Sequence, residues 1–340
     1  MKIYTPGHGI YPDTLIMYSI CNAALKARKP VLLEVKGAGY YYEIEVKDLE
    51  ELARSIANDI SKEEENILKK VGYFTQPQEE RKLRNSLVYL SHYKDCLQFL
   101  KELSAEGHAG DEGRRGGGAT SPVAFTPFAG KYFTDQFNYP DKPYKLCNGC
   151  LGLLTYGFFK GTISTSQLRS KDRVIFIIFT IAFEGYMDKD QIREVLGLYE
   201  HEDSVRREIA KYLDLVPLRV LIQILISRLG RDIVRSMDEA DASWRGIGVK
   251  FEKEKGRAAM EIRGLCELIV DPILNALSTI ESDDYESFLR LVDELEDPTA
   301  LAYLYEYLFK RNMDLLAKAS RYIYQNRPMG ARLAEILAKL

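Results

Sequence analysis

Residues 30–46 read PVLLEVKGAGYYYEIEV, in which two apolar runs flank a glycine turn at 37–39. Apolar runs rich in branched and aromatic residues, separated by glycine, predict a β-hairpin. Helical apolar spacing surrounds this hairpin over residues 13–28, 47–60 and 79–103. The first hundred residues therefore predict a region, 1–103, that mixes helices with strands.

The chain beyond residue 185 shows helical apolar spacing almost to its end. Its stretches often begin with a helix-start residue such as Asp188, Pro217 or Pro298, and the connections between them are short. We therefore expect a helical bundle over residues 186–340, including one helix through 256–280. The predicted fold class is α+β, a mixed α/β N-terminal part followed by a predominantly α-helical C-terminal bundle.

A glycine-rich stretch, residues 104–130, follows the first region. It reads SAEGHAGDEGRRGGGATSPVAFTPFAG, a composition with too few apolar residues to bury a core, and it predicts a flexible loop. The next region, 131–185, interleaves aromatic and cationic residues around a Cys-Asn-Gly-Cys motif. The chain is thus expected to divide at about residues 103, 130 and 185.

Charge is unevenly distributed along this chain, whose net charge is −3. Residues 114–173 carry nine Lys and Arg against three Asp and Glu, a net charge of +6, between two acidic flanks. A basic segment between acidic flanks is typical of a localised site for an anionic partner, and a linker that merely lacks acids is the alternative. The candidate nucleic-acid-binding residues are Arg114, Arg115, Lys131, Lys142, Lys145, Lys160, Arg169, Lys171 and Arg173.

Aromatic residues accompany these cations, among them Tyr144, Tyr156, Phe158 and Phe159. Rings beside cations are the ingredients of single-stranded nucleic-acid binding, in which bases stack on the rings. Burial in the core is the commoner reason for a single aromatic residue such as Phe158. A second cationic patch is expected to be a solvated loop between helices, and it comprises Arg245, Lys250, Lys253, Lys255 and Arg257.

The five cysteines are an odd number without the regular spacing of a disulfide framework. Cys147 and Cys150 enclose Asn-Gly, a favoured tight-turn dipeptide, so the pair is expected to cap a turn. His92 and Cys96 stand four apart on the predicted helix 79–103 and would share a face. The four side chains would make a Cys3His set, a ligand type of structural zinc. The alternatives are a core role for Cys96 and a Cys147–Cys150 thiol pair that oxidises.

Signatures of catalysis are scarce in the sequence. It contains no phosphate-binding loop, no H-E-x-x-H, no G-x-S-x-G and no dinucleotide fingerprint after a strand. Gly7-His8-Gly9 is expected to be a glycine turn with a hydrogen-bonded histidine, so we expect no enzymatic activity. The opening lacks the apolar run of a secretory signal, and the longest apolar run, 174–183, is too short to cross a membrane. We therefore expect a cytoplasmic protein.

Two blocks of sequence resemble a known family. They are MKIYTPGHGIYPDTLI, residues 1–16, and YFTDQFNYPDKPYKLCNGCLGLLTYGFFKG, residues 132–161. Together with the helical C-terminal third, they resemble the large subunit of archaeal type I-A CRISPR effector complexes, the Cascade large subunit of the Csa type. The likeness extends over most of the chain and is most specific in these two blocks.

The resemblance implies a non-catalytic subunit of an RNA-guided surveillance complex in antiviral defence. Such a subunit helps to recognise the motif that flanks the protospacer, binds target DNA, holds the displaced strand and helps to recruit the helicase and nuclease. The implied partners are the guide RNA, target double-stranded DNA, the small and backbone subunits, and the helicase and nuclease. A helical protein-interaction scaffold and a metal-dependent nucleic-acid enzyme around His8 and Cys147/Cys150 are the alternatives.

Overall fold

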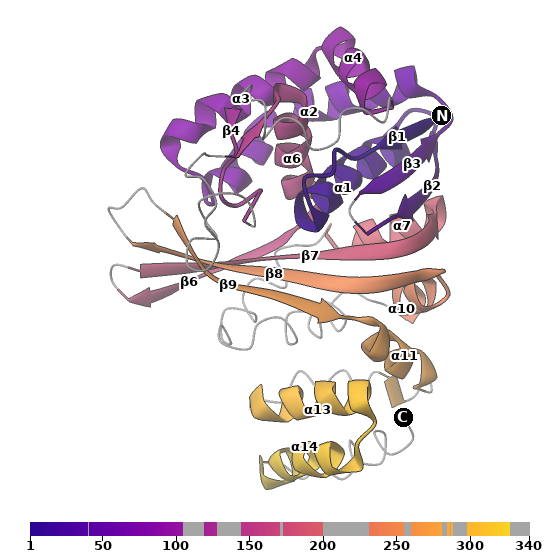
Figure 1. The fold of residues 1–340 in the computed structure, drawn as a ribbon, viewed down its shortest axis with the longest axis vertical. Coiled ribbons are helices and arrows are strands. Elements are labelled where there is room, and N and C mark those ends of the chain that lie inside the picture. Colours follow the sequence, from indigo (N-terminus) through magenta and orange to yellow (C-terminus); the bar gives the residue numbers. More distant parts are fainter. Residues whose placement is uncertain are drawn as a thin grey trace.

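A computed structural model describes residues 1–39, 41–104, 119–127, 144–170, 173–199, 231–254, 260–280, 284–285, 287 and 298–326. At some positions inside these ranges, including 165–170 and 173, it describes the backbone alone. The chain mixes helices with a central antiparallel sheet, and helices lie on both sides of the long strands (Figure 1). The mixed character expected from the sequence is confirmed, whereas the expected order of the parts holds only in part.

The elements and their bounds are as follows. The strands are β1 (Lys2–Tyr4), β2 (Leu32–Gly37), β3 (Tyr42–Val46), β4 (Ala119–Thr120), β5 (Lys145–Leu146), β6 (Ile163–Ser170), β7 (Arg173–Asp188), β8 (Ala242–Glu254) and β9 (Met260–Ile269). The helices are α1 (Ile10–Lys26), α2 (Leu49–Gly72), α3 (Pro77–Ser91), α4 (Tyr93–Leu103), α6 (Asn148–Gly161), α7 (Lys189–Gly197), α10 (Arg231–Asp238), α11 (Asp271–Thr279), α13 (Pro298–Lys310) and α14 (Met313–Asn326).

β7 is the central strand of the main sheet, whose strand order is β1-β3-β2-β7-β8-β9. Its first half pairs with β6, its last four residues pair with β2, and residues 173–185 pair with β8. Residues 175–183, most of the long apolar run, are all buried. A continuous apolar run is expected of a strand that is covered on both faces. The run therefore forms the buried centre of the sheet.

The N-terminal elements follow the predictions closely. The hairpin at 30–46 forms as β2 and β3, and α2 begins after Asp48, whose carboxylate accepts the backbone N–H groups of Glu50 and Glu51. α1 begins at Ile10, ahead of the expected start at Asp13. The predicted helix 79–103 is broken at His92, whose extended backbone separates α3 from α4.

The expected C-terminal helical bundle is wrong for residues 242–254 and 260–269, which form β8 and β9. β9 runs to Ile269 and α11 begins at Asp271, so the stretch expected to be one helix contains a strand and then a helix. β8 pairs with β7 and β9 pairs with β8, and these long-range partners outweigh the local helical spacing. α11, α13 and α14 agree with the helical prediction, and residues 200–230 lie outside the described part.

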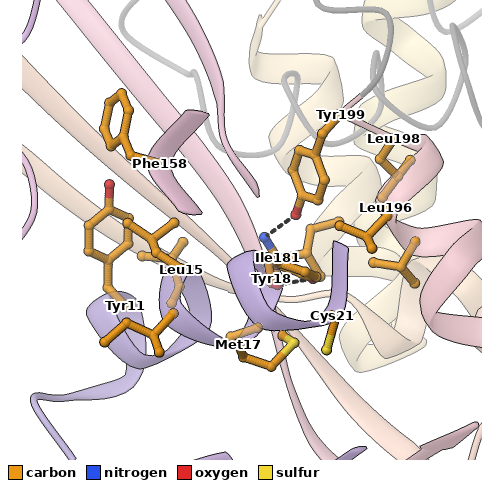
Figure 2. Packing of buried hydrophobic residues seen from close by; sticks show 14 of the residues in the cluster. Tyr11, Leu15, Met17, Tyr18, Cys21, Phe158, Ile181, Leu196, Leu198 and Tyr199 are labelled. Atoms are coloured by element: carbon orange, nitrogen blue, oxygen red, sulfur yellow. Dashed lines mark hydrogen bonds between the residues drawn. The ribbon is translucent and has the colours of Figure 1, made fainter. Parts of the chain in front are cut away.

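α1 is buried along most of its length and contacts α6, α2 and the sheet. Toward the sheet, the Tyr18 hydroxyl donates to the Ile181 carbonyl at 2.6 Å, and the Ile181 N–H donates to the Tyr199 hydroxyl at 3.1 Å (Figure 2). Toward α6, Gly157 lies so close to Leu15 that an added Cβ would be 1.9 Å from the Leu15 carbonyl oxygen. Residues 1–16 and the end of the 132–161 block therefore pack directly against each other.

Candidate functional site

The Gly7-His8-Gly9 loop wraps around a buried carboxylate. Asp13 is fully buried and accepts the N–H groups of Gly7 at 2.8 Å and Gly9 at 2.9 Å. Both glycines have positive φ angles, 77° and 117°, which suits a residue without Cβ. Burial raises the pKa of Asp13 to about 6, although His8, Thr5 and the two N–H donors act in the opposite direction. Asp13 thus fixes the loop and does not cap α1 from outside.

His8 connects this loop to the segment that precedes the cysteines. Its Nδ1 lies 2.7 Å from the Tyr144 hydroxyl, and the two rings meet edge to face. The Tyr144 carbonyl accepts the Ser121 N–H at 2.8 Å, and the Tyr11 hydroxyl donates to the Ala124 carbonyl at 3.2 Å. The expected glycine turn with a hydrogen-bonded histidine is confirmed. Three segments far apart in the sequence meet here.

Residues 119–127 are packed, although they were expected to belong to a flexible loop that continued to residue 130. Ala124 and Phe125 are fully buried, and β4 pairs with β5. The alternation of Pro, Val, Ala and Phe in this part supplies the apolar surface that its glycine-rich neighbour lacks. Apart from Ser104, the rest of the expected loop lies outside the described residues, as do five of the candidate cations: Arg114, Arg115, Lys131, Lys142 and Lys171.

The cysteine motif begins a helix and not the expected Asn-Gly turn. Asn148 and Gly149 are the first residues of α6, and the sulfur of Cys147 accepts the N–H of Cys150 at 3.3 Å as an N-cap. An added Cβ on Gly149 would lie 2.4 Å from the Phe99 ring, so glycine allows the helix to start against α4. Cys150 is fully buried, whereas Cys147 is half-buried.

The proposed Cys3His zinc set is not assembled in the structure. His92 is exposed at the break between α3 and α4, where its Nδ1 lies 2.7 Å from the Val88 carbonyl. Cys96 is fully buried, and burial raises the pKa of its thiol to about 12. Within the described ranges, no group of three or more His, Cys, Asp and Glu side chains is placed to hold a metal ion. A structural zinc ion at Cys147 and Cys150 stays a prediction.

The aromatic residues of α6 belong mainly to the core, which is the explanation that the sequence favoured for a single residue such as Phe158. Tyr156 and Phe158 are fully buried, and the Phe158 ring packs against Phe74 and Phe125 at centroid distances of 5.2 and 5.4 Å. The Tyr156 hydroxyl accepts a hydrogen bond from Asn22 at 2.6 Å and donates one to Asp59. These rings cannot stack on bases without leaving the core.

Lys160 contacts the protein itself. Its ammonium lies 4.6 Å from the centroid of the half-buried Phe159 ring, a cation–π arrangement. Burial and the neighbouring Lys26 lower the pKa of Lys160. Lys70, which the sequence analysis overlooked, donates to the carbonyls of Phe159 at 3.0 Å and Thr162 at 2.9 Å and so caps the end of α6. Both lysines thus stabilise α6. Lys160 lies on this helix, and Lys70 caps its end.

Two cationic segments that are about 80 residues apart in the sequence meet at one end of the sheet. Ser170 pairs with Arg173 in the β6–β7 hairpin, and in the β7–β8 ladder Arg173 is opposite Glu254 and Val174 is opposite Lys253. Lys250 and Lys253 of the second patch therefore lie on β8, and the expectation of a loop is wrong for them. The hairpin ends of β6–β7 and β8–β9 project on the same side of the molecule (Figure 1).

We call the described cationic positions at this place the basic sheet end: Arg169, Arg173, Lys250 and Lys253. On β8, Lys253 stands between the acidic residues Glu252 and Glu254. Lys171, Lys255 and Arg257 belong to the connections between these strands and lie outside the described residues. Pattern reading missed this grouping because it depends on the pairing of β7 with β8, for which single-sequence spacing gives no signal.

Arg245, from the same predicted patch, lies near the opposite end of β8. Its guanidinium donates to Glu267 on β9 at 2.9 Å and contacts Glu184 on β7 at 3.4 Å. All three side chains are largely exposed, so these ion pairs contribute little to stability. They do neutralise Arg245 locally, so the five cations of the patch do not act as one group.

Lys145 lies on β5, immediately before the cysteine motif, and is half-buried. Together with Tyr144, it connects the β4–β5 ribbon to the start of α6. Its role as a nucleic-acid contact stays a prediction. None of the helices in the described ranges is long and apolar enough to cross a membrane.

Comparison with known proteins gives a family for the chain. No curated protein matches the sequence. The profile of a family described as CRISPR-associated protein (Cas_Csa4) matches residues 1–339. This match includes both blocks that meet at α1 and α6, and it agrees with the Csa-type resemblance noted in the sequence. The chain belongs to the CRISPR-associated Cas_Csa4 family.

Proposed function

We propose that this chain is the non-catalytic large subunit of a type I-A RNA-guided CRISPR surveillance complex. In this role it helps to recognise the protospacer-flanking motif, binds target DNA, holds the displaced strand and helps to recruit a helicase and a nuclease. Its partners are the guide RNA, target double-stranded DNA, and the small and backbone subunits. Family membership supports the CRISPR role, and the juxtaposed cationic segments of the basic sheet end support contact with nucleic acid.

The division of labour in such complexes explains why charge can suffice. Base pairing with the guide reads the sequence, while protein contacts hold backbones and read a short duplex motif. Phosphate contacts from Lys and Arg carry no base information and make affinity depend on salt. Hairpin ends that carry cations on neighbouring strands suit this task because they bring several cationic positions close together at one end of the sheet.

Burial of the α6 aromatics favours charge over stacking as the mode of binding. Tyr156 and Phe158 are fully buried, so the cations next to them in sequence do not stand beside free ring faces. Binding should therefore tolerate many sequences and weaken steeply as salt rises.

A non-catalytic role is also part of this proposal. Asp13, the buried carboxylate beside His8, accepts two backbone N–H groups, and this use is structural. The pure chain should therefore not cleave DNA or RNA in the presence of divalent metal ions. Cleavage that is lost on substitution of His8 or Cys147 would contradict this part of the proposal.

A protein-interaction scaffold is the second candidate function, and exposed apolar side chains favour it. Leu265 and Ile269 on β9 are each 43% exposed, and Phe309 and Met313 on α13 and α14 are 52% and 62% exposed. Such residues are suited to contact with neighbouring subunits. The two functions are compatible in one complex, and they differ in whether nucleic acid touches this chain.

Reconstitution of the complex with and without this chain tests the proposal. The other subunits and guide RNA should assemble, and target duplex binding should fall sharply when the chain is omitted. Crosslinking of the complete complex to target DNA should label this chain. Unchanged target binding without the chain would overturn the proposal, whereas loss of binding without any crosslink would support the scaffold.

A further inference from the structure

The two cysteines of the motif are placed as an exchangeable dithiol. Cys147 is the N-cap of α6 and Cys150 is the third residue of the helix, so both lie on its first turn. The Cys147 sulfur is 3.3 Å from the backbone nitrogen of Cys150, an atom two covalent bonds from the Cys150 Cβ. A disulfide requires Cβ atoms about 3.5–4.5 Å apart. Because the Cys147 sulfur already lies this close to the Cys150 backbone, we expect the two side chains to reach this range without unfolding of α6.

The surroundings hold this geometry in place. Gly149, between the cysteines, lies against the Phe99 ring, with 2.4 Å between the ring and the position of an added Cβ. The Leu151 N–H donates to the Cys147 carbonyl at 3.0 Å, which closes the first turn of the helix. The backbone that sets the distance between the two thiols is therefore fixed by packing and by the helix itself.

The two thiols differ in access. Cys147 is half-buried at a helix N-terminus, a position that favours the thiolate and admits a small reagent. Cys150 is fully buried, and solvent reaches it less readily than Cys147. This pairing of an accessible thiol with an enclosed one suits an attacking cysteine and a resolving cysteine.

We propose that Cys147 and Cys150 form a redox-active dithiol, which a small disulfide such as oxidised glutathione converts to an intramolecular disulfide. This inference is independent of the proposed nucleic-acid role. It assigns the motif a thiol–disulfide exchange function where the sequence had also suggested zinc.

The exchange proceeds in two balanced steps. The Cys147 thiol loses its proton to solvent, and its thiolate attacks one sulfur of oxidised glutathione, which forms a mixed disulfide and releases one glutathione thiolate. The Cys150 thiol then loses its proton, and its thiolate attacks the Cys147 sulfur and expels the second glutathione thiolate. Both thiolates take up protons from solvent. The protein loses two electrons and two hydrogens, and one oxidised glutathione becomes two reduced molecules.

Two other cysteines serve as internal controls. Cys21 and Cys96 are fully buried, and burial raises the pKa of both thiols, that of Cys96 to about 12. Neither should react in the folded chain. Reaction at these positions would report unfolding and not exchange at the motif.

The test equilibrates the full-length chain with mixtures of reduced and oxidised glutathione, traps it with acid and alkylates it for mass spectrometry. We expect a product two hydrogens lighter, mapped to a Cys147–Cys150 link, with Cys21 and Cys96 alkylated only after denaturation. Cys150→Ser should accumulate a glutathione adduct on Cys147, because the resolving thiol is absent. Cys147→Ser should leave Cys150 unmodified.

Three outcomes would overturn the proposal. One is the absence of the link at any glutathione ratio in a chain that circular dichroism shows to be folded. A second is equal modification of Cys150 in the Cys147→Ser variant. The third is a stoichiometric zinc ion that survives dialysis and is released only when both cysteines are alkylated, because that result makes the motif a metal site.

Discussion

The α1–α6 contact and the basic sheet end differ in nearly every physical respect. At the first, Leu15 and Gly157 meet backbone to backbone in a buried interface, and α1 also packs on β7, where the Tyr18 hydroxyl donates to the Ile181 carbonyl. At the second, Arg173 and Lys253 occupy neighbouring strands at the end of the sheet. The described parts of the two blocks that resemble the family, residues 1–16 and 144–161, are therefore largely core, whereas the positions suited to nucleic acid are set by strand pairing.

This contrast separates two kinds of substitution. Changes at the α1–α6 contact should alter the free energy of unfolding and affect binding only through folding. Changes at the basic sheet end should alter the salt dependence of binding and have a smaller effect on stability, because Lys250 and Lys253 are only half-buried and do not belong to the packed core.

Gly157→Ala should have the largest effect on stability. Its Cβ would lie 1.9 Å from the Leu15 carbonyl oxygen, so the helices must separate, and the free energy of unfolding should fall by about 3 kcal/mol. Gly197→Ala is the matched control, since nothing lies within 4 Å of its added Cβ. Chemical denaturation of both variants measures the difference. Equal stability of the two variants would show that α1 and α6 are not in this close contact.

Asp13, on α1, should make the free energy of unfolding depend on pH. Its pKa is about 6 in the folded chain against an ordinary value of 3.8, so the folded state holds the proton more tightly. Stability from this group is therefore present at low pH and is lost as pH rises from about 4 to about 6. The loss is on the order of 2–3 kcal/mol.

Asp13→Asn isolates this contribution, because the amide does not titrate. The difference in unfolding free energy between the original chain and the variant should change across pH 4 to 6 and be constant above pH 7. Denaturation at several pH values gives this difference directly. Parallel profiles over the whole range would mean that Asp13 is not buried as described.

Tyr18→Phe should have a smaller effect on stability, at the contact between α1 and β7. It removes the 2.6 Å hydrogen bond to the Ile181 carbonyl and leaves the ring in place, which should cost about 1 kcal/mol. Tyr186→Phe, at a side chain 41% exposed, should cost much less. Thermal unfolding of the pair would show the difference, and a reversed order would contradict the packing of α1 on β7.

The N-terminal elements could be predicted from the sequence because their signals are local. The glycine turn at 37–39 predicted the hairpin of β2 and β3. Asp48 precedes α2 as its N-cap, and its carboxylate accepts the N–H groups of the next residues. The turn around His8 was also anticipated, whereas the buried carboxylate of Asp13 that holds its two glycines was not. Local turn and cap chemistry is readable without knowledge of distant partners.

Other features depended on partners far away in the chain. β9 has apolar spacing that suits a helix, and only pairing with β8 makes it a strand. The Cys3His hypothesis failed because His92 lies at a break between helices, which the leucine spacing of 79–103 did not reveal. The basic sheet end could not be foreseen for the same reason, since it joins positions about 80 residues apart.

The most direct test of the central claim is the salt dependence of target binding by the assembled complex. Arg173→Ala combined with Lys253→Ala removes two cations of the basic sheet end, and Arg245→Ala removes one that already pairs with Glu184 and Glu267. We expect the double variant to lower the slope of log affinity against log salt by about 2, one for each lost phosphate contact, while Arg245→Ala leaves it unchanged. An unchanged slope in a double variant that still assembles, or an equal loss in Arg245→Ala, would contradict the claim that this end of the sheet contacts nucleic acid.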